Sequence, residues 1–445
     1  MLGFWTSLGG EFIKNRLIGV TFFEEQLLRV FLLSDNFQLL RNLLTRNDVL
    51  IFTRPDLKER IESLLKLNGF ESISVLVFKD TNETVMTRLL SFILRWIDPS
   101  TGTLRVLYRE REYLRITSFG LMFRKMIYIV FSNIPKLKIS IRYLYIVATR
   151  SSYLKKSFSK TPPKLDLLFI TSLTNIESDL QIGIFYKKKN TPVIATVRSW
   201  DNLVTKGILR LSPDIFLSHS KYMSEIAIQN HELQPTSIRT LITPCYQNRY
   251  KPARLLLDEK KLEISYGCIG PFLNPDELNF IKELCDISRK TNVQLTIIQH
   301  PKFFHDFKNV DLEKIEVKTF DYLNSTLTSY YTFLATQNFV IASGTTLALD
   351  ALFVGTPVLG LEFEIQTQDF WSSHLRSYDV VPHTMKLFEN YQIPRLRNKV
   401  ELIEYLSGKK LIDLDQYFNF DLEFITGDEH KIFIDELINA ISYLV

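Results

Sequence analysis

One stretch of the chain, residues 339–360, restricts the fold more than any other. Its first four residues, Phe339 to Ala342, form an apolar run typical of a buried strand. Ser343 and Gly344 then permit a sharp backbone turn. A short apolar helix is predicted next, and it should end at Gly355-Thr356-Pro357, since proline cannot continue it. Strand, tight loop, helix and strand in this order predict an α/β fold with a parallel sheet.

The loop of this unit also has the chemistry of an anion site. Ser343, Thr345 and Thr346 carry hydroxyl groups and are possible helix N-caps. Free backbone N–H groups at a helix start, together with the helix dipole, suit a phosphate. Asp350 lies about one and a half turns into the helix and can overlook the same loop. An ordinary packing unit, in which Gly344 only allows close contact, explains the pattern equally well.

Strand and helix patterns alternate along most of the chain, which predicts a doubly wound parallel sheet in each of two domains. The first domain should cover residues 1–248 and the second 249–445, with the crossover near 243–247. Residues 83–160 interrupt the alternation and predict a helical insertion, whereas residues 1–25 suggest at most an amphipathic helix. The expected strands are 29–33, 49–53, 73–78, 167–170, 192–197, 214–218, 238–242, 261–265, 293–298 and 314–320.

Composition favours a globular protein of the cytoplasm. The 445 residues are 46% hydrophobic and 23% charged, and the three cysteines are an odd number without CxxC spacing. No HExxH helix is present, so we expect neither a metal nor another cofactor. Residues 1–10 lack the basic start of a secretory signal, and no uncharged apolar run reaches membrane-spanning length.

Positive charge is concentrated in residues 113–165, which contain no Asp or Glu although the net charge is only +5. Many aromatic and aliphatic residues lie in the same window, a combination typical of segments that bind anionic membranes. A solvated helix face is the plainer interpretation, and no nucleic-acid-binding motif is present. The cations are Arg115, Arg124, Lys125, Lys136, Lys138, Arg142, Arg150, Lys155, Lys156, Lys160 and Lys164.

A second polar stretch, Arg198 to Gly207, follows the strand expected at 192–197. Ligands of open α/β sheets bind outside the carboxyl ends of the strands, which is where this stretch falls. Asp201 offers a carboxylate that could take a proton from a hydroxyl, and Asn202 could orient it. Arg198 and Lys206 offer cations to an anion. A turn with a helix cap, in which Trp200 is a packing residue, is the simpler reading of this stretch taken alone.

Further candidates follow strands of the second domain. Gly267 and Gly270 would let a phosphate approach the backbone, although their spacing is not a dinucleotide fingerprint. His300 and Lys302 follow the strand at 293–298 and could neutralise a diphosphate. Glu362 follows the last strand of the 339–360 unit and could bind sugar hydroxyls, or it could be a surface acid.

Two of these motifs resemble a known superfamily. Ser343-Gly344-Thr345-Thr346, Asp350 and Gly355-Thr356-Pro357 are similar to the nucleotide-sugar-binding loop and helix of GT-B glycosyltransferases, where the acidic position is usually Glu. The 198–207 stretch resembles the Ser-Trp-Asp-Asn-Leu-Thr-x-Lys-Gly motif of bacterial surface-polysaccharide proteins, with Val204 as the one departure. More distantly, its position resembles the Trp-His-Gly motif of CDP-glycerol glycerophosphotransferases. The His-Pro of 300–301 resembles their Arg-x-His-Pro loop, with Ile298 in place of Arg.

The resemblance implies two Rossmann-like domains facing each other across a cleft. It implies a metal-independent glycosyltransferase of cell-surface polysaccharide biosynthesis, acting on a nucleotide-sugar and a lipid-linked or surface-glycan acceptor. Asp201 would be the base, and the last helix would pack back on the first domain. We expect a peripheral location on the inner face of the cytoplasmic membrane. A nucleotide-sugar epimerase, a glycerophosphotransferase-like enzyme and an inactive assembly protein of the same architecture remain open.

Overall fold

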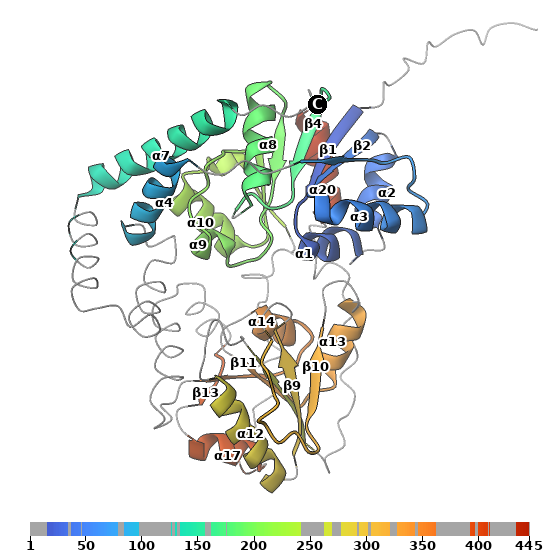
Figure 1. The fold of residues 1–445 in the computed structure, drawn as a ribbon, viewed down its shortest axis with the longest axis vertical. Coiled ribbons are helices and arrows are strands. Elements are labelled where there is room, and N and C mark those ends of the chain that lie inside the picture. The colour runs from blue at the N-terminus through green and yellow to red at the C-terminus, as the bar shows by residue number, and fades with distance from the viewer. Residues whose placement is uncertain are drawn as a thin grey trace, which may run out of the picture.

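The computed structural model describes most of the chain outside the basic window and the crossover. The described residues are 16–33, 37–45, 47–78, 84–97, 126, 130, 134–155, 162–174, 176–241, 262–268, 277–291, 293–300, 304–320, 327–342, 346–361, 392–396, 399–407, 409 and 433–444. They form two lobes, each built around one sheet (Figure 1). The predicted crossover at 243–247 lies outside the described residues.

The N-terminal lobe contains a seven-stranded sheet in the order β3-β2-β1-β4-β5-β6-β7, and all neighbouring strands are parallel. Helices connect the strands, as the alternation predicted. Whole strands such as β4 and β6 are buried, because helices cover both faces of a parallel sheet. The strands are β1 (Arg16–Phe22), β2 (Asn47–Thr53), β3 (Ser74–Val77), β4 (Leu167–Ile170), β5 (Val193–Ala195), β6 (Ile215–Ser218) and β7 (Ile238–Thr240).

Helices of this lobe follow the strands. Between β3 and β4, where the helical insertion was predicted, the structure describes α4 (Val85–Ile97) and α7 (Pro135–Lys155). The others are α1 (Glu25–Leu28), α2 (Gln38–Leu44), α3 (Pro55–Leu67), α8 (Glu177–Lys188), α9 (Asn202–Thr205) and α10 (Lys221–His231).

The first strand differs from the prediction. We expected it at 29–33, but those residues form a π-helical turn, and the sheet begins with β1 at Arg16–Phe22. A short apolar run such as Arg29–Leu33 fits a buried helical turn as well as a strand. Gly19 of β1 weakens the strand pattern, but a Cβ there would lie 2.5 Å from Leu165 Cδ1 and 2.9 Å from Phe52 Cε2, so any larger residue would displace these buried side chains.

The C-terminal lobe contains a six-stranded parallel sheet in the order β10-β9-β8-β11-β12-β13. The predicted unit at 339–360 is present as strand, helix and strand, and it lies in the middle of this sheet. The strands are β8 (Leu262–Gly267), β9 (Val293–Gln299), β10 (Glu316–Thr319), β11 (Phe339–Ala342), β12 (Val358–Leu361) and β13 (Arg395–Leu396). The helices of this lobe are α12 (Glu277–Thr291), α13 (Leu327–Ala335), α14 (Thr346–Phe353) and α17 (Lys399–Leu406), whereas the last helix, α20 (Phe433–Leu444), lies in the N-terminal lobe (Figure 1).

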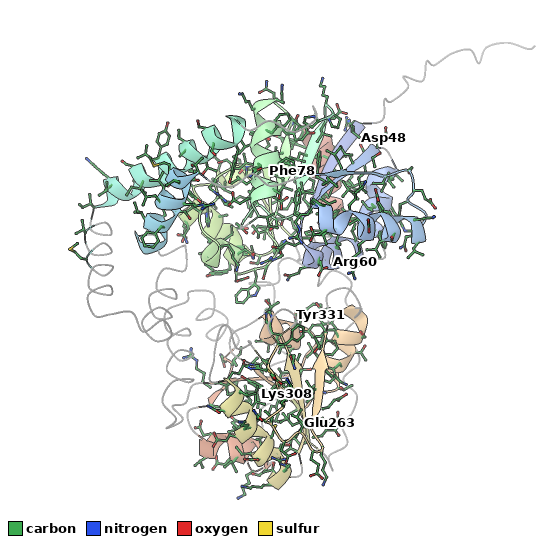
Figure 2. All side chains as sticks on the ribbon, viewed as in Figure 1. Asp48, Arg60, Phe78, Glu263, Lys308 and Tyr331 are labelled. Carbon is green, nitrogen blue, oxygen red and sulfur yellow. The ribbon has the colours of Figure 1, made fainter. Side chains whose placement is uncertain are left out.

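The two sheets direct their carboxyl ends toward each other. Asp48 at the start of β2 and Glu263 near the start of β8 lie on the outer sides of the two lobes (Figure 2). Tyr331 of α13 lies on the side of the C-terminal lobe nearer the N-terminal lobe. The last helix, α20, contacts α2 of the N-terminal lobe. No helix among the described residues is long and apolar enough to cross a membrane.

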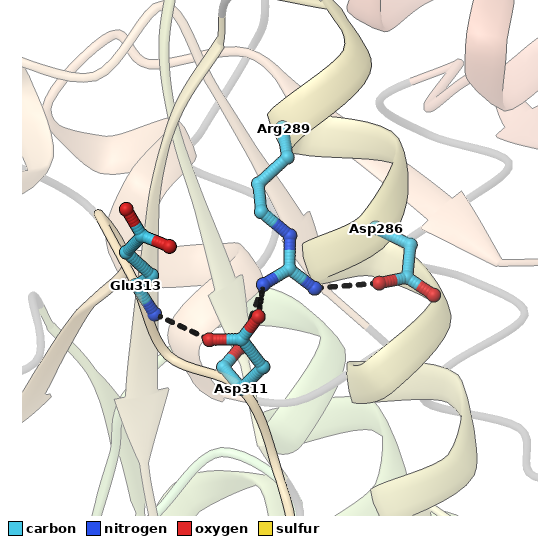
Figure 3. Close-up of polar contacts among 4 residues, drawn as sticks. All are labelled: Asp286, Arg289, Asp311 and Glu313. Atoms are coloured by element: carbon cyan, nitrogen blue, oxygen red, sulfur yellow. Dashed lines mark hydrogen bonds and ion pairs between the residues drawn. The ribbon is translucent and has the colours of Figure 1, made fainter.

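An ion-pair network secures α12 to the segment that precedes β10. Arg289 bonds Asp286 on its own helix and Asp311 across the gap, while the backbone N–H of Glu313 donates to Asp311 at 3.0 Å (Figure 3). The Glu313 hydrogen bond, and then the Arg289 charge, lower the pKa of Asp311. The network lies at the outer side of the lobe and has no part in the facing edges.

Candidate functional site

The carboxyl edge of the N-terminal sheet is lined by buried polar residues. Several strands of that sheet end in hydroxyl-bearing or imidazole side chains that are buried although ordinary cores exclude them. Thr53 donates to Phe22 O at 2.7 Å, and Thr171 donates to Thr21 O, so part of this set joins the strand ends. The set comprises Thr21, Thr53, Thr171, Ser172, Thr196, Ser218, His219 and Ser220.

Asp201 and Asn202 lie on this edge, after β5. Asp201 is half-exposed and occupies the N-cap position of α9, but within the described residues its side chain does not cap the helix. The simpler reading of Asp201 as a helix cap is therefore not what the structure shows. Asn202 is 1% exposed, and neither polar atom of its amide has a hydrogen-bond partner in the described part of the chain. An unpaired buried polar atom costs roughly 1–3 kcal/mol, so an asparagine is an unusual residue for this position in the lobe.

The cations of the stretch have different surroundings. Arg198 forms an ion pair with Glu24, which follows β1, and both side chains are largely buried. Lys206 is exposed and follows α9, and its backbone N–H donates to Asn202 O at 3.0 Å. Trp200 is 5% exposed and packs in the core of the lobe. Arg198 thus has a carboxylate partner within the protein, and Lys206 lies at the surface.

His231, the last residue of α10, fixes the position of α9. The N–H of Leu209 donates to His231 Nδ1 at 3.1 Å, so the ring proton is on Nε2. Nε2 donates to Leu203 O at 2.7 Å. One neutral imidazole therefore holds both α9 and the loop that follows it, which keeps Asp201 and Asn202 on a rigid support.

His219 directly follows β6 and is fully buried. Its Nε2 lies 2.9 Å from Thr196 Oγ1, and Thr196 Oγ1 also lies 2.8 Å from Leu217 O. A carbonyl only accepts, so Thr196 donates to Leu217 and must accept from His219 Nε2–H. Nδ1 is then a bare acceptor, and no described residue pairs with it. Burial lowers the pKa of His219 to about 4, so the ring is neutral at pH 7.

On the C-terminal lobe, the end of β8 lies against the start of α14. A Cβ on Gly267 would come within 2.0 Å of Leu347 Cδ2. The absence of a side chain at Gly267 thus lets α14 approach the strand, and the atom that makes this close approach is a leucine methyl. Thr346, the first residue of α14, is exposed.

Asp350 lies in the middle of α14 and is half-buried. The phenolic hydroxyl of Tyr330, on α13, donates to Asp350 Oδ2 at 3.0 Å. Tyr330 is itself buried, so the bond fixes the rotamer of the carboxylate and links the two helices. His300 directly follows β9 and is half-buried. Five other predicted donor-site residues lie outside the described part of the chain, as does Glu362: Gly270, Lys302, Ser343, Gly344 and Thr345.

A buried acid at the start of α12 connects β8 to the segment that follows β9. Glu277, at the start of α12, accepts from Tyr266 OH at 2.7 Å and bonds His305 Nε2 at 2.6 Å. Glu277 and His305 are both buried. Tyr266 lies in β8 and His305 in the segment after β9, so the network holds the ends of two neighbouring strands in register.

Two cavities lined by described residues lie away from these edges. One of about 590 Å³ is lined by Arg16, Asn47, Asp435 and neighbours, at the amino ends of β1 and β2. Another of about 410 Å³ lies between α12 and α17. We assign neither to chemistry, because both are remote from the facing carboxyl edges. No three or more His, Cys, Asp or Glu side chains are grouped to hold a metal among the residues described.

The sequence matches no protein-family profile and no curated protein. Similar solved structures include the glycotransferase of kitacinnamycin, at 9% identity over 96% of this chain and 99% of that chain, with a TM-score of 0.52. Arabidopsis thaliana UGT89C1 complexed with UDP-L-rhamnose is 12% identical over 97% and 99%, with a TM-score of 0.51. A UDP-GlcNAc 2-epimerase from Methanocaldococcus jannaschii, in complex with UDP-GlcNAc and UDP, reaches 0.49 at 9% identity over 96% and 99%. Together with the two facing parallel sheets, the first two show the GT-B fold.

Sequence reasoning missed Glu24, His219, Glu277 and His305. A usable signal existed for His219, because it directly follows a strand, as His300 does. The other three become visible only through their partners, which are distant in sequence.

Proposed function

We propose that the protein is a metal-independent glycosyltransferase that moves a sugar from a nucleotide-sugar donor to an acceptor hydroxyl. The observation that carries the proposal is the opposition of two polar strand edges within the GT-B fold. One bears the Asp201–Asn202 pair, and the other bears His300 and the start of α14. Two similar solved structures are glycosyltransferases, one of them holding a UDP-sugar, which supports a donor of that class.

The donor would bind at the C-terminal edge. N–H groups at the start of α14, with Ser343, Gly344 and Thr345 before it, would bind the diphosphate, and Asp350 would bind the ribose. His300 and Lys302 would stabilise the charge on the leaving diphosphate, and Gly267, Gly270 and Glu362 complete the proposed donor set. The hydrogen bond from Tyr330 pre-orients the Asp350 carboxylate for this contact.

The acceptor would bind at the N-terminal edge. Asp201 takes the proton of the acceptor hydroxyl while the new bond forms between that oxygen and the anomeric carbon. The bond from the anomeric carbon to the diphosphate breaks, and the diphosphate leaves as an anion. Asn202 and Lys206 position the acceptor, Lys206 as an exposed cation and the buried Asn202 by supporting the turn that carries Asp201.

We take the acceptor to be a lipid-linked or surface glycan, handled by a peripheral protein on the inner face of the cytoplasmic membrane. The acid-free, basic residues 113–165 support this location.

Binding of UDP, CDP, GDP and TDP and of their sugar conjugates tests the donor site, by thermal shift followed by calorimetry. We expect one nucleotide class to bind to the wild type and to lose affinity in Asp350→Asn, whereas Asp435→Asn, an exposed acid on α20, is the matched control. Incubation of the bound sugar nucleotide without acceptor distinguishes an epimerase, which would change the sugar, from a transferase, which would leave it intact apart from slow hydrolysis.

A non-catalytic protein of the same fold is the second candidate. Two predicted ligand-binding side chains already have partners within the protein, Arg198 with Glu24 and Asp350 with Tyr330. A folded sample that binds no nucleotide in the screen would favour this candidate over the transferase.

A further inference from the structure

Helices α4 and α7 lie side by side at the edge of the N-terminal lobe away from α2 and α3 (Figure 1). Leu94 of α4 packs against Ile141 and Tyr145 of α7, and Ile208 completes this small core. The opposite sides of the two helices are exposed and still apolar. We define the α4–α7 face as the exposed side chains Val85, Met86, Leu89, Phe92, Ile139, Tyr143, Leu144 and Val147.

The spacing of these residues makes an apolar stripe along each helix. Ile139, Tyr143 and Val147 follow one another at intervals of four residues, so they form one stripe along α7. Val85 and Leu89 on α4 are spaced in the same way. Exposure is large, at 67% for Tyr143 and 83% for Val85. Contiguous apolar surface of this kind marks an interaction site, unlike single exposed apolar residues.

Charge decides what the face fits. Neither α4 nor α7 contains an Asp or a Glu. Arg88 on α4 and Lys136 and Arg150 on α7 are exposed, and the last two lie about 21 Å apart along the helix. The face is therefore an apolar strip with a cation near each end.

Other polar groups of α7 are used to attach it to the lobe. Arg142 donates to Asn230 O at 2.5 Å and pairs with Glu232 at 3.3 Å, both at the end of α10. Tyr145 lies under the guanidinium of Arg210 at 5.4 Å, and Tyr153 bonds Glu177 of α8. The helix is thus fixed through its inner side, and its outer side is left for a partner.

We propose that the α4–α7 face docks on an anionic lipid bilayer. Apolar side chains of an interfacial helix enter the boundary between headgroups and acyl chains, and cations beside them attract anionic headgroups. A second copy of the chain is a poorer occupant, because pairing would oppose two positive, acid-free surfaces. The inference rests on the membrane location in the proposed function and names the surface that would dock, but it does not depend on the transfer reaction or on any nucleotide being bound.

Flotation of the full chain with vesicles tests the proposal, using phosphatidylcholine with and without phosphatidylglycerol. We expect the wild type to float with the anionic vesicles, to float little with the neutral ones and to dissociate as salt is raised. The triple variant Ile139→Gln, Tyr143→Ser, Val147→Gln should lose flotation. Its control, Leu67→Gln, Val400→Gln, Tyr443→Ser, removes comparable exposed apolar side chains elsewhere and should float as the wild type does.

The cations are tested separately. Lys136→Gln with Arg150→Gln should weaken binding to anionic vesicles by roughly fivefold per charge. The control pair Lys66→Gln with Lys290→Gln removes two exposed cations outside the face and should change binding little. Wild type that stays unbound, or face variants that float as well as their controls, would overturn the proposal. So would a dimer by light scattering that becomes monomeric in the triple variant without vesicle binding. Circular dichroism and nucleotide binding of every variant separate this failure from misfolding and from failure of the donor site.

Discussion

His219 donates from Nε2 to the hydroxyl of Thr196 across 2.9 Å, and that hydroxyl in turn donates to Leu217 O. The relay fixes one tautomer of a fully buried imidazole and joins the ends of β5 and β6. It also leaves Nδ1 as a buried acceptor beside the proposed acceptor edge. A neutral ring is essential to this arrangement, because protonation would place a charge in the core.

The stability of the protein should therefore fall in mild acid because of His219. Its pKa is about 4 in the folded state and 6.5 in the unfolded chain, so the unfolded state binds more protons between these values. Above about pH 6.5 His219 therefore does not lower the free energy of unfolding. As the pH falls toward 4, proton binding by the unfolded state lowers this free energy, by about 3 kcal/mol in all. In His219→Gln this loss should be absent, and Gln can still donate to Thr196.

Urea unfolding between pH 4 and 7.5 measures this effect. As the pH falls, the free energy of unfolding of the wild type should decrease relative to that of His219→Gln. A difference that stays constant over the whole range would show that His219 does not titrate as its burial indicates.

Asp201→Asn should abolish most transfer without affecting the donor site. A general base contributes roughly a hundredfold to ten-thousandfold to a rate, so at least a hundredfold loss of kcat is expected. Nucleotide affinity should be unchanged, because Asp201 belongs to the opposite lobe. Steady-state transfer and calorimetry on the same sample give both values. Full transfer by the variant would remove Asp201 from the role of base.

Asp350 and Tyr330 should separate binding from orientation. Asp350→Asn should weaken nucleotide binding by about tenfold to a hundredfold, since a charge-assisted hydrogen bond contributes about 1.5–3 kcal/mol. Tyr330→Phe removes only the bond to Oδ2, so affinity should fall by a few-fold at most while unfolding free energy drops by about 1 kcal/mol. Equal binding losses in the two variants would mean that the Tyr330 bond, rather than a ribose contact, carries the effect.

Gly267→Ala should destabilise the C-terminal lobe. The new Cβ would lie 2.0 Å from Leu347 Cδ2, and overpacking of this kind costs about 1–3 kcal/mol. In the double variant Gly267→Ala, Leu347→Ala the clash is gone. The double variant should therefore lose less unfolding free energy than the sum of the losses in the two single variants. Thermal unfolding of the single and double variants measures the coupling. Additive costs would show that Leu347 moves aside freely.

The parallel sheets could be predicted because each strand and helix is indicated by a short segment of the sequence. Strands such as Leu167–Ile170 and Phe339–Ala342 are short apolar runs, and the glycine and proline at 355–357 mark the end of a helix. The same locality made 16–22 hard to assign. Gly19 weakens the strand pattern there, and the reason for a glycine is the side chain of Leu165, on a distant segment.

The candidate site was partly visible for the same reason. Asp201 and Asn202 come a few residues after a strand and His300 follows one directly, so their place at a sheet edge could be expected from the sequence. The side-chain partners could not be predicted, because they are far apart in the sequence. Glu24 and Arg198 are separated by 174 residues, and Glu277 and His305 by 28. Nothing near any of these residues in the sequence indicates its partner.

The attachment of α7 to α10 has a geometric consequence. Arg142 holds α7 to the end of α10, and His231 at the same end holds α9, which follows Asp201. A chain docked through α7 would therefore keep its acceptor edge at one height above the bilayer. The protein would then select acceptors by their length. A glycan too short to bring its hydroxyl to that height would not be modified, whatever its chemistry.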